Sequence, residues 1–440
     1  MRWRVEKAQQ VGALGKPTPQ AGSGEVDIRL IINNLANYLF HLMVMNETHL
    51  ITFGAIGTGK STLIKNALMN VPSGYTVVVF DIMGNYEGFT DYHAPYPFNP
   101  VSHLGDLDVL DVIEEAISMR FPKLPYAMTP AMEQVFISTL SKLRSRESTQ
   151  NGREGQGAQQ GEALEDEVSI SRVIRQIDED IESGALSKED EVNSARGLKR
   201  RLLYFDHWVF RSTHPLINRL FRGELRGRSV GINLSWLSPI QRWFYVLSFL
   251  AAVNAAGARN IIFVIDEAHL YFRLGESTLT ASVRIGRNYN RYFALISQSI
   301  NDIPDEFINM NKLFVEFPIM YMRAENIIFG EPNLKAHYGR DAYYDPSNIR
   351  ELPTPPHWKP LTARIHLHVT NQLLYRELGE AYYRVSITVN PEVPRRANST
   401  TLTKCAEAVG IEPGIIKAGG FVHKKYANEL WEVWQCVGRP

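Results

Sequence analysis

This chain has few cysteines, no net charge and no long hydrophobic run. Only Cys405 and Cys436 occur among 440 residues, which disfavours a disulfide framework and favours free thiols in a reducing compartment. The 47 Lys plus Arg residues equal the 47 Asp plus Glu residues. The chain as a whole therefore attracts neither nucleic acid nor membrane by its charge, although a ring with a local basic channel remains compatible with this balance.

No apolar run is long enough to cross a bilayer. The longest, residues 244–253 (FYVLSFLAAV), reads as a core helix, and residues 28–45 are interrupted by asparagines and a histidine. The charged start MRWRVEKAQQ has no apolar run behind it, so we expect no signal peptide. We expect a cytoplasmic protein, with peripheral docking at the inner face of a membrane as a further option.

The strongest motif lies in residues 53–63, FGAIGTGKSTL, which fit the P-loop (Walker A) pattern G-x-x-x-x-G-K-[ST]. Glycines let the backbone turn its N–H groups toward phosphate oxygens, and the following helix presents its positive end to them. Lys60 is expected to reach the β- and γ-phosphates, and Ser61 to bind Mg²⁺. The alternative is a glycine-rich turn that binds nothing. The expected ATP-binding residues are Gly54, Gly57, Thr58, Gly59, Lys60, Ser61 and Thr62.

A second motif matches Walker B. In residues 260–269 (NIIFVIDEAH) an apolar strand ends in two adjacent carboxylates, at the end of a strand where open α/β sheets bind ligands. Asp266 is expected to hold Mg²⁺, directly or through water, and Glu267 to accept a proton from the attacking water. The alternative, a solvated acidic turn, is disfavoured by the P-loop in the same chain. The adjacent Glu favours hydrolysis over phosphoryl transfer to a small molecule.

Predicted strands alternate with helices, which indicates an α/β fold with a mostly parallel sheet covered on both faces. The polar, Gly/Gln-rich residues 146–167 have little to bury and predict a disordered linker. The expected domains are a flexible segment 1–25, a first core part 26–103, a helical insertion 104–226, a second core part 227–394 and a small helical extension 395–440.

In order along residues 45–320, several motifs resemble the HerA/FtsK superfamily of motor ATPases, nearest its HerA-like and conjugative (type IV secretion) branches. The resemblance implies a RecA-like (ASCE) P-loop core. The matching stretches are GAIGTGKST, the strand ending in Asp81 with GNY behind it, the strand ending in NLS, VIDEAH, Ile285-Gly286-Arg287-Asn288 and ALISQS.

The resemblance also implies roles for single residues. Gln298 would end a strand between the P-loop strand and the Asp266 strand, with its amide near the γ-phosphate or the lytic water. Arg287 would be an arginine finger supplied to a neighbouring subunit, with Arg284 and Arg291 as substitutes. A solvated cation or a DNA-facing residue are the alternatives for Arg287. Where HerA-like proteins usually carry Glu, this chain has Asn85, which puts a catalytic role of that acid in question, although Glu87 could reach the same region.

Together these features predict a homo-hexameric ring that hydrolyses ATP with Mg²⁺ and moves DNA, with duplex DNA expected in the ring channel. Conjugative transfer, DNA import and viral packaging are the settings that stay open. Local basic clusters (199–201, 219–228, 395–396) with neighbouring aromatic residues offer candidate DNA contacts, although core packing is the favoured explanation of the aromatics. One rival is an assembly or secretion ATPase that acts on protein and ignores DNA. Another is a scaffold that binds ATP without turnover. Residues 400–424 resemble a helix-turn-helix loosely, and a helical packing tail is the alternative.

Overall fold

The structure, a computed structural model, describes residues 27–54, 56–123, 128–151, 167–272, 277–317 and 361–389. The segments predicted for 1–25 and 395–440, and both cysteines, lie outside the described residues. Among the described helices, none combines the length and the apolar composition that a bilayer span requires.

A nine-stranded sheet forms the centre of the fold, in the order β3-β4-β2-β5-β6-β1-β7-β8-β9. The strands from β3 to β7 run parallel, and β8 and β9 join antiparallel at one edge. The α/β fold with a mostly parallel sheet is confirmed. The strands are β1 (Leu50–Phe53), β2 (Thr76–Asp81), β3 (Tyr92–Ala94), β4 (Ser229–Asn233), β5 (Ile261–Ile265), β6 (Arg291–Ser297), β7 (Leu313–Glu316), β8 (Leu361–His368) and β9 (Tyr382–Val389).

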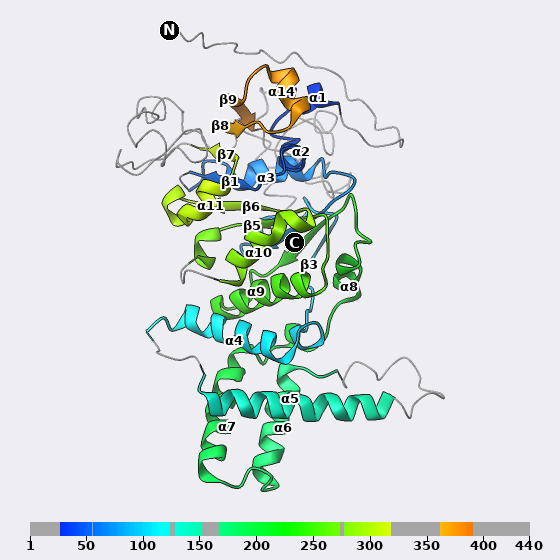
Figure 1. The fold of residues 1–440 in the computed structure, drawn as a ribbon, viewed down its shortest axis with the longest axis vertical. Helices are drawn as coiled ribbons and strands as arrows, with labels where there is room; N and C mark the ends of the chain where they lie inside the picture. The colour runs from blue at the N-terminus through cyan, green and yellow to red at the C-terminus, as the bar shows by residue number, and fades with distance from the viewer. Residues whose placement is uncertain are drawn as a thin grey trace, which may run out of the picture.

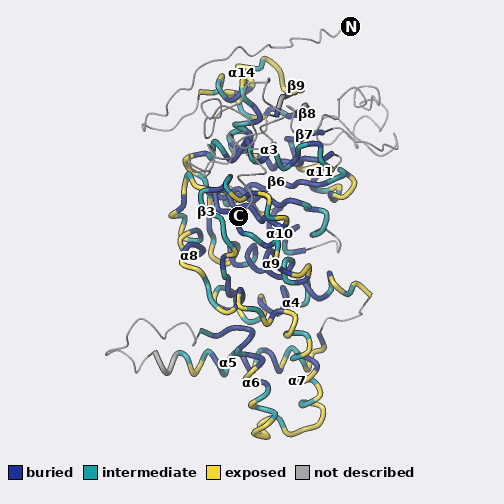
Figure 2. Tube along the Cα trace, turned by 180° about the vertical axis from the view of Figure 1, so that it is seen from behind, coloured by how far each residue is buried: buried dark blue, intermediate teal, exposed yellow. Residues whose placement is uncertain are grey.

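Helices cover both faces of this sheet, which explains why the central strands are apolar throughout rather than alternating. Every residue of β2 (TVVVFD) and β5 (IIFVI) is buried. Two hydrophobic cores result, one on each face. The first holds α4 (Asp106–Arg120), α9 (Pro239–Ala255) and α10 (Thr278–Gly286), and the second holds α2 (Leu39–Met45), α3 (Lys60–Leu68) and α14 (Gln372–Leu378). Figure 2 shows this burial along the chain.

Between β3 and β4 the chain leaves the sheet and forms helices. In Figure 1 α5, α6 and α7 lie beyond α4 at one end of the molecule, opposite the end that carries β8, β9 and α14. Helix α5 continues through Asn151, into the stretch predicted as a linker from 146; residues 152–166 are outside the described part. These helices are α5 (Pro130–Asn151), α6 (Ile170–Glu182), α7 (Glu189–Leu202) and α8 (Pro215–Phe221); α1 (Ile28–Asn33) and α11 (Asp305–Met310) complete the set of described α-helices.

The position of β6 decides where the functional side chains meet. It lies between β1, which leads into the P-loop, and β5, which leads into Asp266. The predicted place of the strand that ends before Gln298 is therefore confirmed. Because the three strands are parallel, their carboxyl ends open at one edge of the sheet.

Candidate nucleotide-binding site

The residue pairing across β1, β5 and β6 sets the geometry of this edge. Phe53, the last residue of β1, lies beside Ser297, the last residue of β6, and Ile265 of β5 lies beside Leu295. The residues that follow these strands are the P-loop, Gln298 and Asp266. The P-loop is thus brought to one site with Asp266 and Gln298, which follow it by more than 200 positions in the chain, at the carboxyl ends of the strands where open α/β sheets bind ligands.

The P-loop backbone has the conformations that its glycines permit. Gly57 and Gly59 have φ of 76° and 109°, in the region that side chains disfavour. A Cβ on Gly54 would lie 2.5 Å from Cβ of Phe317, which follows β7. Helix α3 begins at Lys60 and presents its N-terminal N–H groups to this loop. The Lys60 ammonium donates to the Gly54 carbonyl at 2.8 Å, which holds the side chain across the loop.

A set of hard oxygen donors lies beside the loop. The Ser61 hydroxyl donates to Oδ2 of Asp266 at 3.0 Å. Hydroxyl and carboxylate oxygens of this kind, completed by substrate phosphates, suit Mg²⁺, which is seldom held by protein cages alone. Burial raises the pKa of the Asp266 carboxyl, and hydrogen bonds from Tyr86 and Ser61 work against that rise. The residues present therefore fit the cation that the motif implies.

Glu267 lies at the same edge in a conformation unusual for a residue with a side chain. Its φ is 53° and its ψ is 45°, left-handed values that non-glycine residues adopt mainly where the surroundings enforce them. Its Oε2 lies 3.3 Å from Nε2 of Gln298 and 3.3 Å from Nδ1 of His269. The structure thus brings the expected base and the expected amide sensor together.

Arg287 lies at the opposite edge of the sheet. It follows α10 and precedes β6, next to the strand beginnings rather than the strand ends, and its charge acts on buried His49 just before β1. Its guanidinium donates to the Met310 carbonyl at 2.5 Å. Arg284, one turn earlier on α10, forms an ion pair with Glu306. Within one subunit neither side chain is at the P-loop edge.

Arg291 has a structural role in this fold. It is 1 % exposed, and its guanidinium donates to the Ala258 carbonyl at 2.6 Å and to Asn254. The cation also lies 4.3 Å from the centre of the Tyr289 ring, and burial lowers its pKa to about 10. A side chain held in this way is not available to a neighbouring subunit, so the geometry disfavours Arg291 as a substitute finger.

The motif analysis gave no role to Tyr86 or Asp81, and both are central to the site. The Tyr86 hydroxyl donates to Oδ2 of Asp266 at 3.0 Å, while Asp81 accepts the backbone N–H groups of Asn85 and Tyr86, each at 2.9 Å. The signal was the GNY sequence after a buried strand ending in Asp. Asn85 and Glu87 are both exposed.

Several members of the predicted basic clusters are neutralised by nearby carboxylates. Of the aromatic residues near them, Phe205 is buried, whereas Tyr204 and Trp208 are 41 % and 46 % exposed. The ion pairs are Lys199 with Asp178 at 2.7 Å, Arg219 and Arg222 with Glu224 at 3.3 and 2.6 Å, and Arg228 with Asp91 at 3.5 Å.

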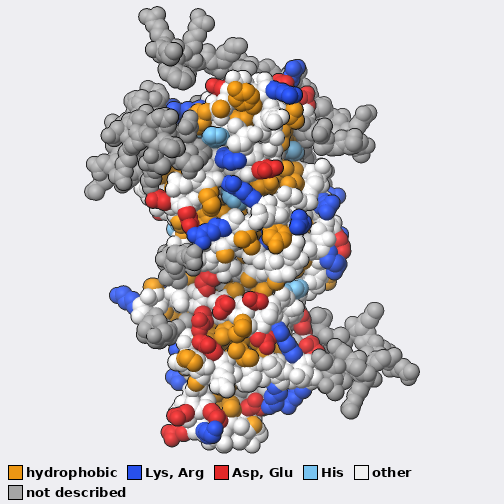
Figure 3. Space-filling model, in the orientation of Figure 1, with side chains coloured by type: hydrophobic (Ala, Val, Ile, Leu, Met, Phe, Trp, Pro, Cys, Tyr) orange, Lys and Arg blue, Asp and Glu red, His pale blue; other side chains and the backbone are white. Residues whose placement is uncertain are grey.

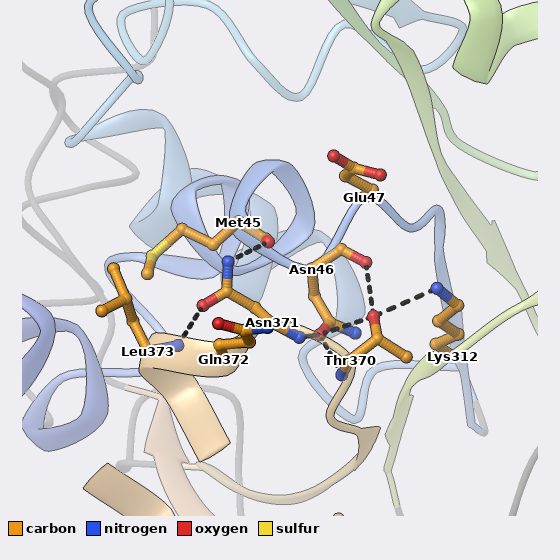
Figure 4. Close-up of a pocket in the computed structure, with 8 residues that line it drawn as sticks. All are labelled: Met45, Asn46, Glu47, Lys312, Thr370, Asn371, Gln372 and Leu373. Atoms are coloured by element: carbon orange, nitrogen blue, oxygen red, sulfur yellow. Dashed lines mark hydrogen bonds between the residues drawn. The ribbon is translucent and has the colours of Figure 1, made fainter. Parts of the chain in front are cut away.

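One described pocket lies away from the nucleotide edge, where the turn before β1 meets Lys312 and the turn before α14 (Figure 4). Its polar groups bond mainly to one another: Asn46 accepts the Thr370 N–H at 2.8 Å, and Lys312 donates to the Thr370 hydroxyl at 3.1 Å. The pocket therefore lies where the ends of β7 and β8 pack against the N-terminal helices.

Comparison with known proteins finds similarity to solved structures alone. No protein-family model matches the chain, and no curated protein does. VirB4 of Thermoanaerobacter pseudethanolicus aligns with a TM-score of 0.46 at 12 % identity, over 78 % of this chain and 89 % of that one.

Structures of a bacterial conjugative coupling protein align similarly. TrwBdeltaN70 with sulphate gives a TM-score of 0.46 at 14 % identity, over 80 % of this chain and 88 % of that one. TrwB with ADP and Mg²⁺ gives 0.46 at 13 %, over 79 % and 86 %. At this level of similarity the neighbours decide nothing about what this chain binds or does.

Proposed function

We propose that this protein hydrolyses ATP with Mg²⁺ at the edge formed by β1, β5 and β6. The observation that carries the proposal is the meeting of Ser61, Asp266, Glu267 and Gln298 beside a P-loop whose glycines have the required backbone geometry. A solvated acidic turn would not place a buried carboxylate on the P-loop serine.

Each residue has a distinct task in this proposal. The loop N–H groups and Lys60 bind the phosphates and stabilise the charge that develops on the γ-phosphoryl group. Ser61 and Asp266 would hold Mg²⁺, which supplies electrostatic stabilisation of the phosphate oxygens when bound. Glu267 orients the attacking water and takes its proton, and the Gln298 amide, 3.3 Å from Glu267, orients the same water.

We further propose that the active unit is a hexameric ring, as the resemblance to the HerA/FtsK superfamily implies. In this ring Arg287 completes the site of the neighbouring subunit. The support is its place at the sheet edge opposite its own P-loop, which excludes action in cis but suits action across an interface. ATP-driven DNA translocation, in conjugative transfer, import or packaging, then follows from the motif resemblance. Docking to a membrane partner fits the same settings.

One observation favours the rival function, a secretion or assembly ATPase acting on protein. The ion pairs of Lys199, Arg219, Arg222 and Arg228 reduce the positive field that DNA phosphates would feel. On the face of the molecule that Figure 3 draws, acidic and basic side chains are interspersed, with acidic ones gathered near the level of α4.

Steady-state ATPase rates without DNA, with single-stranded DNA and with duplex DNA, at low and moderate salt, separate the two functions. A translocase is expected to show several-fold stimulation by duplex that weakens as salt rises, because phosphate contacts release counterions. A robust rate that neither nucleic acid changes would select the protein-directed ATPase. No turnover under any condition, with ATP bound, would select the nucleotide-gated scaffold.

A further inference from the structure

We propose that Tyr86 is a positioning residue that fixes the magnesium-binding carboxylate of Asp266. The inference rests on the proposed nucleotide site and adds to it a residue from the loop that follows β2. Tyr86 is fully buried, and its hydroxyl donates to Oδ2 of Asp266 at 3.0 Å. The backbone N–H of Glu267 donates to the other oxygen, Oδ1, at 3.0 Å. Both oxygens of the carboxylate are therefore held.

The backbone of Tyr86 is anchored independently of the nucleotide loop. Its N–H donates to Oδ2 of Asp81 at 2.9 Å, and the N–H of Asn85 donates to Oδ1 of Asp81 at the same distance. Asp81, the last residue of β2, is itself 0 % exposed and contacts Nε2 of His93 at 2.9 Å. The loop after β2 is thus folded around the Asp81 carboxylate. These hydrogen bonds fix the position of the Tyr86 backbone relative to the end of β2.

The Tyr86 ring is also confined. It packs within the core that holds α2 and α3, beside Phe89, and the Lys65 ammonium lies 5.8 Å from its ring centre and 4.6 Å from that of Phe89. A buried phenol wedged in this way has little rotational freedom, so its hydroxyl is a fixed donor.

The two hydroxyl donors to Asp266 differ in a way that suggests the role of the Tyr86 hydroxyl. Oδ2 also accepts from Ser61, but Ser61 belongs to the phosphate loop and has to turn its oxygen toward a cation to serve as a ligand. Tyr86 is a donor to Oδ2 that belongs to no part of that loop. Groups that orient metal ligands in this manner typically change metal affinity about 10- to 100-fold when they are removed.

The test compares Tyr86→Phe with the wild-type protein and with Tyr245→Phe. Tyr245 is equally buried and its hydroxyl donates to the Tyr96 carbonyl at 2.8 Å, so the control loses one buried hydrogen bond away from the site. The binding of Mn²⁺ to each protein saturated with ADP is followed by electron paramagnetic resonance. ADP affinity without metal is measured alongside, and thermal melting compares the two variants.

We expect the Mn²⁺ dissociation constant to rise about tenfold in Tyr86→Phe and to stay unchanged in Tyr245→Phe, with metal-free ADP affinity unchanged in both. We also expect Tyr86→Phe to add nothing to the loss in Asp266→Asn, because the hydroxyl acts through that carboxylate. Equal Mn²⁺ affinities for wild type and Tyr86→Phe, or an additive double mutant, would overturn the inference alone. A wild-type protein that binds neither ADP nor Mn²⁺–ADP would overturn the proposed function instead.

Discussion

Three acidic side chains near the strand ends show how surroundings assign different tasks to the same chemistry. Asp81 is fully buried and accepts two backbone N–H groups, so it organises a loop. Asp266 accepts hydrogen bonds from the hydroxyl groups of Ser61 and Tyr86, so its carboxylate is fixed in position, as the proposed metal ligand would need to be. Glu267 is partly exposed and accepts a hydrogen bond from the Gln298 amide, with the His269 ring also 3.3 Å away, which suits a base that must meet water.

Glu267→Gln should preserve ATP binding and lower kcat by about 10²- to 10⁴-fold, the usual contribution of a general base. The amide keeps the size of the side chain but accepts no proton at neutral pH. Rapid-quench turnover and equilibrium binding of ATP measure the two effects. Glu224→Gln, on an exposed ion pair remote from the site, is the matched control. Wild-type turnover in Glu267→Gln would remove Glu267 from the role of base.

His49 links stability to pH. It is 4 % exposed, its Nδ1 accepts the Phe293 N–H at 3.1 Å, and burial, aided by the Arg287 charge, lowers its pKa to about 3. Since the unfolded histidine titrates near its ordinary 6.5, the unfolded state binds the proton first, and stability is lost as pH falls below 6.5.

Urea unfolding at pH 7 and pH 5 should therefore show a loss of about 2 kcal/mol in the wild type beyond that in His49→Asn, which keeps an acceptor but does not titrate. Equal losses in both proteins would mean that His49 is not kept neutral by the fold.

At the scale of elements, the carboxyl ends of the strands, rather than whole strands, form the candidate site. Parallel pairing brings the ends of β1 and β6 into register, and β7 continues this edge on the other side of β1. The last residues of β7 consequently form a wall for the P-loop, with Phe317 donating its N–H to the Phe53 carbonyl at 2.8 Å.

Gly54→Ala tests this contact between elements. The added methyl would lie 2.5 Å from Phe317 Cβ, so either the P-loop or the end of β7 has to move. We expect a loss of about 1–3 kcal/mol in unfolding free energy, as for overpacked sites, together with weaker ATP binding. Gly74→Ala, where nothing lies within 4 Å of the new methyl, is the control. Unchanged stability and affinity in Gly54→Ala would show that the edge is loosely packed.

At the scale of the whole molecule, the sheet separates the two halves of the proposed chemistry. The phosphate loop, Asp266 and Glu267 follow strand ends, whereas Arg287 precedes a strand. If Arg287 is the proposed finger, a single subunit cannot use it at its own site, and an interface between copies would bring it to the site of a neighbour.

Mixing Arg287→Ala with Lys60→Ala subunits tests this arrangement. Each variant alone should lose turnover, the first for lack of a finger and the second for lack of phosphate binding. In mixtures, a Lys60→Ala subunit can lend its arginine to an Arg287→Ala neighbour, so ATPase activity should reappear and peak at intermediate ratios. Absence of rescue at every ratio would argue against a trans finger. Arg284→Ala in the same assay decides between the two arginines.

The sequence alone determined the parts of this protein that depend on local chemistry. The P-loop, the Asp266-Glu267 strand and the alternation of strands and helices were readable because glycine geometry, apolar runs and adjacent carboxylates act over a few residues. The domain ranges and the roles of Glu267, Gln298 and Arg287 stay predictions. The short strand β3 was not anticipated, because it forms by pairing with β4, more than 130 positions away. The extension of α5 past position 146 was not anticipated either, because the polar composition there indicated a linker.

Only the tertiary structure decided which side chains meet. Spacing in the chain gave no sign that the Tyr86 hydroxyl reaches Asp266, 180 positions away. Nor did it show that the Arg291 guanidinium binds the Ala258 carbonyl, whereas that of Arg287 binds the Met310 carbonyl. Such contacts depend on strand order and register, which long-range pairing sets and local sequence does not encode. Short sequence motifs thus determine which chemical groups are present, and the order and register of the strands determine which of them meet in the site.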